Sequence, residues 1–202
     1  KFITKNYKNV KNYMHDLHRE IDLLFGLLKE NNIKLNVKTL YFGGGSPTIL
    51  NRDDLKELVD KLKNNFDFSK INEFTIETDP RRVDEDRLLF NNKVCGANRI
   101  SFGMQDFDEE VQRRVNRVQP FEIFEKLLTK EVRKAYKTIA FDLLIGQPGQ
   151  TKATMEKTCD QIIELKPTLV QTSLMAYKPW LNKASIRMVE DGPLPDFMER
   201  KE

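Results

Sequence analysis

The chain alternates between stretches of helical periodicity and short runs of apolar, β-prone residues. Residues 7–31 place apolar side chains three and four positions apart, which predicts a long amphipathic helix. Further helices are predicted at 55–66, 84–90, 108–115, 121–135 and 151–165, and strands at 39–42, 74–76, 98–103, 138–146 and 168–175. Because strands and helices alternate, the pattern predicts an α/β fold with a parallel sheet, right-handed crossovers and outer helices.

The pattern leaves the closure of this sheet open. An open doubly wound sheet and a barrel both fit alternating strands and helices. About five or six strand–helix units are too few for an eightfold barrel but suit a partial one. No shift in composition separates two parts of the chain, so residues 1–202 are expected to form a single domain.

A run of three glycines directly after the first strand is the most distinctive stretch. Gly43, Gly44 and Gly45 have no Cβ atoms, so their backbone groups can approach a polar ligand that a side chain would exclude. Ser46 adds a hydroxyl group, and Pro47 fixes the exit from the loop. The loop lacks the motifs of phosphate and dinucleotide loops, and a plain strand-to-helix turn is the structural alternative.

Unusual polar residues follow the predicted strands at their carboxyl ends. They are Glu77, Asp79, Gln105, Asp106, Asp142, Tyr177 and Lys178. Ligands of parallel α/β proteins bind at this end of the strands, so these side chains are expected to converge. A carboxylate there could bind an amine or a ribose hydroxyl, act as a base, or form a structural salt bridge. Asp142 in particular lies in an apolar strand, where burial without a partner is costly.

Five arginines lie close to the same end of the predicted sheet. Arg113, Arg114 and Arg117 follow the third strand, and Arg81 and Arg82 follow the second. Arginine binds carboxylates through two parallel hydrogen bonds, so these side chains could hold an acidic substrate. A solvated helix face is the alternative interpretation, particularly for Arg113 and Arg114.

Composition excludes several classes of protein. The 34 basic and 31 acidic residues are spread along the chain and give a net charge of +3, which does not indicate a nucleic-acid surface. Hydrophobic residues make up 39%, with 13 phenylalanines, which is typical of a packed globular protein. No apolar run is long enough for a membrane span and no secretory signal is present, so a soluble, cytoplasmic protein is expected.

The residues that commonly bind metals do not form a ligand pattern. Cys95 and Cys159 are far apart and are expected to be small buried apolar residues. His15 and His18 could share a helix face, but no further ligand lies near them in the sequence. The residues therefore predict no metal site in this chain.

Five ordered motifs together carry a family resemblance. They are Tyr41–Thr48, Ile76–Arg81, Ile100–Phe107, Val115–Gln119 and Phe141–Thr151. In this order they resemble the oxygen-independent coproporphyrinogen III oxidases (dehydrogenases) of the radical S-adenosylmethionine (SAM) superfamily. The Gln-Asp-Phe and Val-Asn-Arg-x-Gln pieces resemble the oxidases more than the related haem chaperones, which bind haem without turnover. The anaerobic haem-degrading methyltransferases are also similar and remain an alternative.

The resemblance implies a partial (β/α)₆ barrel that binds a 4Fe–4S cluster and two SAM molecules. Gly43, Gly44, Gly45 and Ser46 would meet the amino and carboxylate groups of the cluster-bound SAM. Further SAM contacts are implied at Glu77, Gln105, Arg117, Asp142 and Ala176. Candidates for the substrate carboxylates are Arg81, Arg82, Arg113 and Arg114.

The implied reaction is an oxidative decarboxylation in haem biosynthesis. Reduction and cleavage of SAM would give a 5′-deoxyadenosyl radical that abstracts hydrogen from a propionate of coproporphyrinogen III. Loss of carbon dioxide and an electron would leave the vinyl groups of protoporphyrinogen IX. The resemblance also implies a tetrapyrrole substrate, an electron donor such as flavodoxin or ferredoxin, and a monomeric enzyme.

Three departures from the family pattern concern the cluster loop, the C-terminal domain and Gln147. The family's Cys-x-x-x-Cys-x-x-Cys loop is expected upstream of Lys1, since Cys95 and Cys159 cannot replace three spaced thiolates. The family's C-terminal domain is also outside these residues, so 1–202 is expected to be a barrel core that is incomplete at both ends and inactive alone. Gln147 stands where a leucine is usual before Pro148.

Overall fold

Five parallel strands form one sheet in a computed structural model that describes residues 7–177, 180, 186, 194 and 195. The strands are β1 (Thr39–Phe42), β2 (Glu73–Thr78), β3 (Arg99–Gln105), β4 (Thr138–Ile145) and β5 (Leu169–Leu174). They pair in chain order, β1-β2-β3-β4-β5. A doubly wound sheet would reverse its strand order at a switch point, whereas a barrel adds each strand beside the last. The α/β prediction is confirmed, and the fold is a partial barrel in which β1 and β5 do not pair within the described residues.

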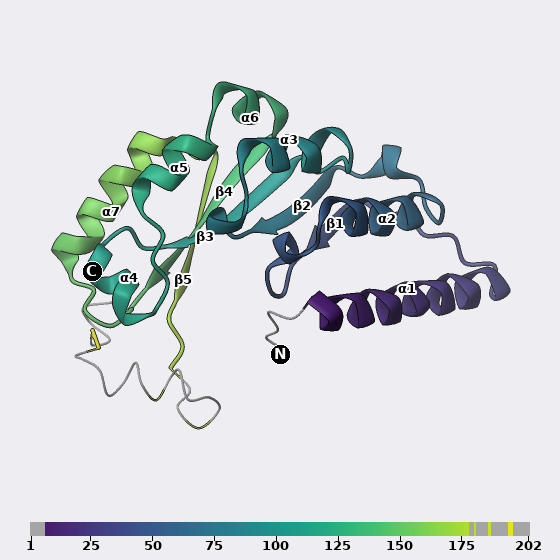
Figure 1. The fold of residues 1–202 in the computed structure, drawn as a ribbon, viewed down its shortest axis with the longest axis horizontal. Helices are drawn as coiled ribbons and strands as arrows, with labels where there is room; N and C mark the ends of the chain where they lie inside the picture. The colour runs from purple at the N-terminus through teal and green to yellow at the C-terminus, as the bar shows by residue number, and fades with distance from the viewer. Residues whose placement is uncertain (1–6, 178–179, 181–185, 187–193, 196–202) are drawn as a thin grey trace.

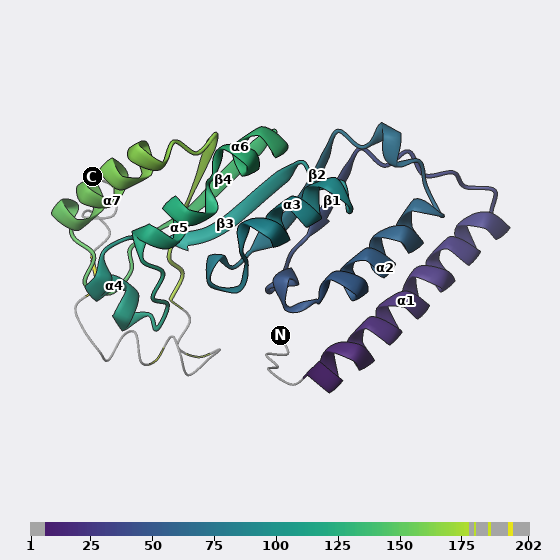
Figure 2. The ribbon, with the colours of Figure 1, turned by 45° about the horizontal axis from the view of Figure 1, so that its top comes forward.

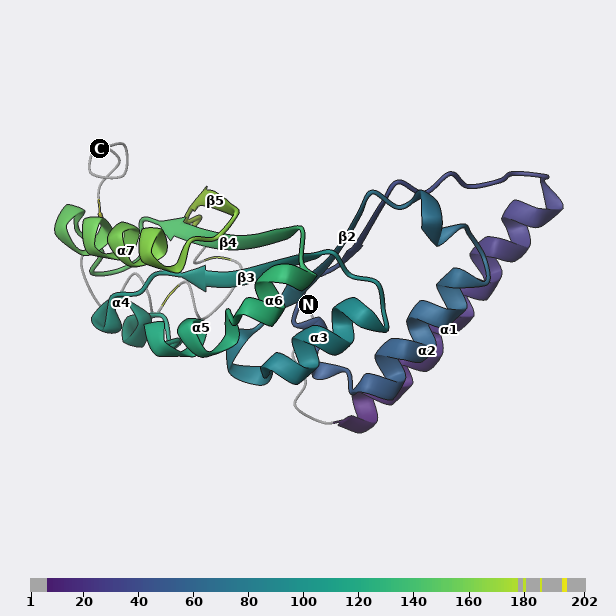
Figure 3. The same cartoon turned by 90° about the horizontal axis from the view of Figure 1, so that it is seen from above.

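Helices connect the strands. They are α1 (Tyr7–Glu30), α2 (Arg52–Lys63), α3 (Glu85–Lys93), α4 (Glu109–Arg114), α5 (Phe121–Leu127), α6 (Lys130–Ala135) and α7 (Lys152–Leu165), with short 3₁₀ turns η1 (Pro47–Ile49), η2 (Phe68–Lys70) and η3 (Pro80–Arg82). Seen from above, α2, α3 and α6 lie on one side of the strands (Figure 3). None of the helices among the described residues is both long and apolar enough to cross a membrane.

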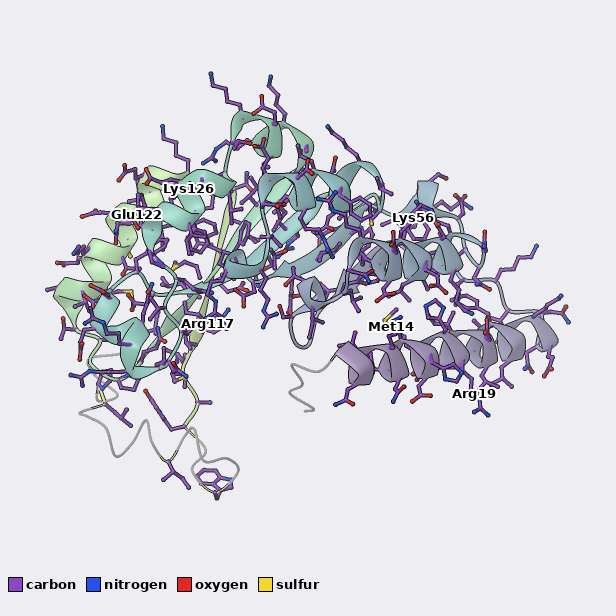
Figure 4. The ribbon with its side chains drawn as sticks, viewed as in Figure 1. Met14, Arg19, Lys56, Arg117, Glu122 and Lys126 are labelled. Atoms are coloured by element: carbon purple, nitrogen blue, oxygen red, sulfur yellow. The ribbon has the colours of Figure 1, made fainter. Side chains whose placement is uncertain are left out.

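Helix α1 adds an outer layer beside α2, and the two helices run side by side (Figure 2). Met14 is buried and points from α1 toward α2, whereas the exposed Arg19 points away (Figure 4). Lys61 of α2 forms an ion pair with Asp22 of α1 at 2.7 Å. The long amphipathic helix predicted from the sequence is therefore confirmed. Val10, Met14 and Ile21 are its buried residues, whereas Tyr13, Leu24 and Leu27 are exposed.

Local capping explains where two of the helices begin. The side chain of Asn51 accepts a hydrogen bond from the backbone N–H of Asp54 (2.7 Å), so α2 begins at Arg52, earlier than predicted. The single helix predicted at 121–135 is wrong. The chain leaves the helical conformation at Leu128 (φ −88°, ψ 51°), and Thr129 caps a new helix by accepting from the N–H of Val132.

The two faces of the sheet differ sharply in chemistry. Alternate residues of β2, β3 and β4 point to the helices and are buried. On this helical face Phe102, Phe124 and Phe141 pack edge to face with centroids 5.3–6.1 Å apart. The opposite face carries Tyr41, Glu77, Ser101 and Asp142, which share the other strand parity. We refer to this second surface as the polar face. All six residues of β5 are exposed.

Truncation of Phe124 should cause a large loss of stability. Its ring is fully buried and contacts the rings of Phe102, Phe107 and Phe141. Phe124→Ala should lower the free energy of unfolding by roughly 3–5 kcal/mol, because a cavity adds to the lost transfer energy. Chemical denaturation measures the change. Ile163→Ala, at a side chain that is 70% exposed, is the control and should change stability by less than about 0.5 kcal/mol. A similar small effect for both variants would contradict the described core.

Candidate functional site

The carboxylate of Glu77 ties the glycine loop to the sheet. Its Oε2 accepts a hydrogen bond from the backbone N–H of Gly44 (2.9 Å), and its Oε1 accepts one from the hydroxyl of Tyr41 (2.7 Å). A structural salt bridge to an arginine was one sequence-based alternative for Glu77. Within the described residues, neutral donors hold this carboxylate instead, so its negative charge remains available to a cationic ligand.

Gly43 is required by this arrangement. A Cβ atom at position 43 would lie 2.7 Å from Cδ of Glu77 and would also overlap the ring of Tyr41. At Gly44 and Gly45, by contrast, no atom lies within 4 Å of a built Cβ. The loop is thus pressed against Tyr41 and Glu77 on one side and open on the other. Ser46, whose Oγ lies 2.8 Å from Oγ1 of Thr48, closes the loop before η1.

Asp142 faces the same surface from β4. Both of its oxygens lie 3.3 Å from Oγ of Ser101, which is a long contact for a hydroxyl–carboxylate pair. Burial raises the pKa of Asp142; the Ser101 hydrogen bond and the positive charges of Arg99 and Arg117 oppose the rise, and the charge of Glu77 adds to it. The Asp142 carboxylate is therefore only weakly hydrogen-bonded, as expected for a group that binds a ligand.

Arg117 reaches the polar face from the segment after α4 (Figure 4). Its Nη2 donates to the carbonyl of Gly103 (2.9 Å), and a Cβ on Gly103 would lie 2.7 Å from that nitrogen. The buried Gln119 directs its side-chain nitrogen toward the carbonyls of Gly103 and Met104. Its side-chain oxygen then accepts a hydrogen bond from Nε of Arg117 at 3.3 Å. Burial lowers the pKa of Arg117, while the nearby charges of Asp79 and Asp142 favour its protonated form.

Asp106 does not join the other predicted residues on the polar face. It is 1% exposed and accepts hydrogen bonds from Thr158 of α7 (2.8 Å), Gln150 (2.5 Å) and the N–H of Asp108 (2.7 Å). The reason is strand parity, because Asp106 shares the parity of Phe102, whose side chain lies on the helical face, and so points toward α7. Asp106 therefore holds the loops after β3 and β4 in place.

Gln147, the residue that departs from the family pattern, belongs to the same buried loop region. Its side-chain amide donates to the carbonyl of Leu144 (3.2 Å) and, more weakly, to that of Gln105 (3.4 Å). Gln105 itself is half-buried at the end of β3. The departure thus adds polar contacts between the ends of β3 and β4.

The four arginines predicted to bind substrate carboxylates all have carboxylate partners within the chain. Asp79 holds Arg81 through two hydrogen bonds (2.9 and 2.8 Å) and lies 3.8 Å from Arg82. Although burial opposes ionisation, the hydrogen bonds from Arg81 hold the pKa of Asp79 below its usual value. Arg113 pairs with Glu109 and Glu110, and Arg114 pairs with Glu110. The structure places both on α4, apart from the Glu77 carboxylate, and their substrate role stays a prediction.

The chain after β5 bonds to the end of β4. Ala176 is exposed, directly after Met175, whose N–H donates to the carbonyl of Ile145 (2.7 Å). The hydroxyl of Tyr177 donates to the carbonyl of Gly146. Lys178 lies outside the described residues. The ends of β4 and β5 are thereby joined.

Two residues of the site were not singled out from the sequence. Tyr41 and Ser101 hold the two carboxylates, Glu77 and Asp142. Tyr41 points to the same face as Glu77 because it pairs with Thr75, two positions before Glu77, and this register is not given by the sequence pattern. Ser101 carries no signal either, since a serine in a strand is common.

The described residues offer no set of metal ligands. Cys95 is fully buried, and burial raises the pKa of its thiol to about 11. Burial also raises the pKa of Cys159. No group of three or more His, Cys, Asp or Glu side chains in the described part of the chain could hold a metal ion. An iron–sulfur cluster needs thiolates, so these residues do not fit one.

Gly43→Ala should displace the glycine loop from Glu77. The new methyl group would collide with the carboxylate carbon, so the Gly44 N–H should lose its partner and exchange with solvent at least about tenfold faster. Hydrogen exchange of the loop measures this. Gly45→Ala is the matched control, because its Cβ has open space. Equal protection in the two variants would contradict the described loop.

Comparison with known proteins supports the radical SAM part of the resemblance. The family model described as the radical SAM superfamily matches residues 6–162. Oxygen-independent coproporphyrinogen III oxidase from Helicobacter pylori is 34% identical over 193 residues, which cover 94% of this chain and 41% of that protein. The protein of the same name from Escherichia coli K12 is 33% identical over 200 residues, covering 99% of this chain and 42% of the relative.

A solved structure shows the same fold. Coproporphyrinogen III oxidase from Escherichia coli, described as a radical SAM enzyme, superposes with a TM-score of 0.89 at 30% identity and covers 100% of this chain and 45% of that one. The chain thus spans 41% and 42% of the length of the two curated relatives named above. Because the superfamily model matches most of its length, this chain belongs to the radical SAM superfamily.

Proposed function

We propose that this chain carries the SAM-binding barrel of an oxygen-independent coproporphyrinogen III oxidase, which decarboxylates coproporphyrinogen III oxidatively to protoporphyrinogen IX. The observation that carries the proposal is the Glu77 carboxylate, held by Tyr41 and Gly44 beneath a glycine loop that is open on its other side. The similarity to enzymes of that name over nearly the whole chain supports the choice of reaction.

The chemistry of the polar face fits SAM. SAM carries an ammonium, a carboxylate, a sulfonium and a ribose that a protein can bind. Glu77 offers a carboxylate held by neutral donors to the ammonium, and the backbone of the open loop with Ser46 offers groups to the amino acid portion. Asp142 faces the same surface from β4 and is suited to ribose hydroxyls or to a second SAM molecule. Gln105, Arg117 and Ala176 are proposed to line the same sites.

The proposed reaction needs two groups, and the described residues are suited to bind only one of them, SAM. Together, a 4Fe–4S cluster and SAM supply the hydrogen-atom abstraction that begins loss of carbon dioxide from a propionate. Since the described residues do not fit the cluster, its ligands are proposed to lie upstream of Lys1. The contribution of these residues is to bind and orient SAM.

A substrate with four carboxylates suits the paired arginines. The pairs of Arg113 and Arg114 with Glu109 and Glu110 are at least partly exposed, and exposed pairs are worth only about 0–1 kcal/mol, so a substrate carboxylate could replace the internal partner. Arg81 and Arg82 share Asp79, whose side chain is only 11% exposed, so this low value does not apply to them, and they stay proposed carboxylate contacts. The proposal also includes an electron donor such as flavodoxin or ferredoxin and a monomeric, cytoplasmic enzyme.

Activity of the full-length protein tests the proposal. We expect the protein, reconstituted with iron and sulfide without oxygen and then reduced, to convert coproporphyrinogen III to protoporphyrinogen IX with release of 5′-deoxyadenosine. Glu77→Gln should reduce this turnover by at least about tenfold, because it removes a charged partner of the ammonium. SAM cleavage without loss of coproporphyrinogen, with turnover of haem, would replace the proposal by haem degradation. Haem binding without productive SAM cleavage would indicate a chaperone.

Neutralising Asp142 should stabilise the protein while weakening SAM binding. Because burial raises the folded-state pKa above the unfolded value, the folded protein binds more protons, and stability falls as pH rises through the folded pKa. Asp142→Asn keeps an acceptor for Ser101 but removes the charge, so its unfolding temperature should exceed that of the wild type near pH 8 and match it near pH 4. Thermal unfolding across this range checks the prediction. The exposed Asp160→Asn is the control, and equal pH profiles for all three proteins would contradict it.

A further inference from the structure

Tyr41 occupies a position next to the glycine loop that the proposed function does not use. It is the third residue of β1 and points to the polar face, two positions before Gly43. Its hydroxyl donates to Oε1 of Glu77 at 2.7 Å, while the Gly44 N–H donates to Oε2 at 2.9 Å. The two donors therefore form hydrogen bonds to different oxygens of the Glu77 carboxylate and fix the plane in which it lies.

The ring of Tyr41 also sets the course of the loop. A methyl group at position 43 would overlap the ring edge, so the backbone of Gly43 runs in direct contact with the ring. The side of the residue away from this contact is open, because Tyr41 is 54% exposed. Tyr41 therefore lines the surface of the site and does not belong to the core.

We propose that Tyr41 is a positioning residue, which orients the Glu77 carboxylate and holds the glycine loop against it so that Glu77 meets the ammonium group of SAM. This inference rests on the proposed function for its ligand. It depends on the two hydrogen bonds to Glu77 and on the contact between the ring of Tyr41 and Gly43.

A tyrosine suits this role better than a basic residue would. Burial, then the hydrogen bond to Glu77 and its negative charge, raise the pKa of Tyr41 to about 12. The hydroxyl therefore remains a neutral donor throughout the physiological range. A lysine or arginine could orient Glu77 equally well, but its positive charge would compete with the ligand's ammonium for the same carboxylate.

Removal of the single hydroxyl tests the proposal. In the full-length protein, Tyr41→Phe keeps the ring beside Gly43 but leaves Glu77 Oε1 without its donor. We expect the Gly44 amide to exchange with solvent several-fold faster and the Kd for SAM, measured by calorimetry, to rise roughly tenfold. The unfolding temperature should stay near that of the wild type, because the residue is half-exposed. Tyr13→Phe, at a tyrosine of α1 that is 63% exposed, is the matched control and should change neither quantity.

A double-mutant cycle separates positioning from a general structural effect. In a Glu77→Ala background, Tyr41→Phe should cause no further change in Gly44 exchange or in the Kd, because its only route to the ligand is gone. Equal effects in both backgrounds would overturn the role of Tyr41, as would unchanged exchange and affinity in the single variant of a protein that binds SAM normally. Failure of the wild-type protein to bind SAM would instead overturn the proposed function and the ligand named here.

Discussion

The hydrogen bonds that converge on Glu77 are the constraint on which the candidate site depends. One carboxylate joins the end of β1, the glycine loop and β2, because it accepts from Tyr41 and Gly44 while its own backbone belongs to the sheet. The glycine at position 43 follows from this contact, since any larger residue would push the loop away. The donors are neutral, so the charge of the carboxylate is oriented without being cancelled. A site for a cationic ligand thus arises from two segments that are separated in the sequence, the end of β1 with its glycine loop and the end of β2.

The sheet divides stability and ligand chemistry between its two faces. On the helical face, phenylalanines from β3, β4 and α5 pack in edge-to-face contacts and bury large apolar surfaces. On the polar face, Asp142 and Arg117 lie where burial disfavours their charged forms, and Arg99 carries a buried Nε with no hydrogen-bond partner among the described residues. Such groups weaken the folded state unless a ligand completes their contacts. The packing of the opposite face offsets this cost.

Much of this arrangement could be predicted from periodicity and strand chemistry. The alternation of elements predicted the parallel sheet, and the rule that ligands bind at the carboxyl ends of strands brought together Glu77, Asp142 and the glycine loop. The rule failed for Asp106, because this residue shares the strand parity of Phe102 and its side chain therefore points toward α7 and away from the polar face. Residue spacing also could not show whether Arg81 binds a substrate or a carboxylate of its own chain. In the structure Arg81 donates to Asp79, two positions before it, within a local turn. The helical periodicity of residues 121–135 is continuous, so it did not show that one helix ends before Leu128 and that Thr129 caps a new one.

The sequential order of the strands has a consequence for how the protein acquires its structure. Every strand pairs with the one made immediately before it, and partners lie between 24 and 39 positions apart, as for Thr75 with Arg99 and Arg99 with Thr138. Each new unit therefore needs only a short loop closure onto a surface that already exists. The segments that carry Tyr41, the glycine loop and Glu77 are therefore all translated once β2 has emerged, before β3, β4 and β5, and their pairing can begin during synthesis.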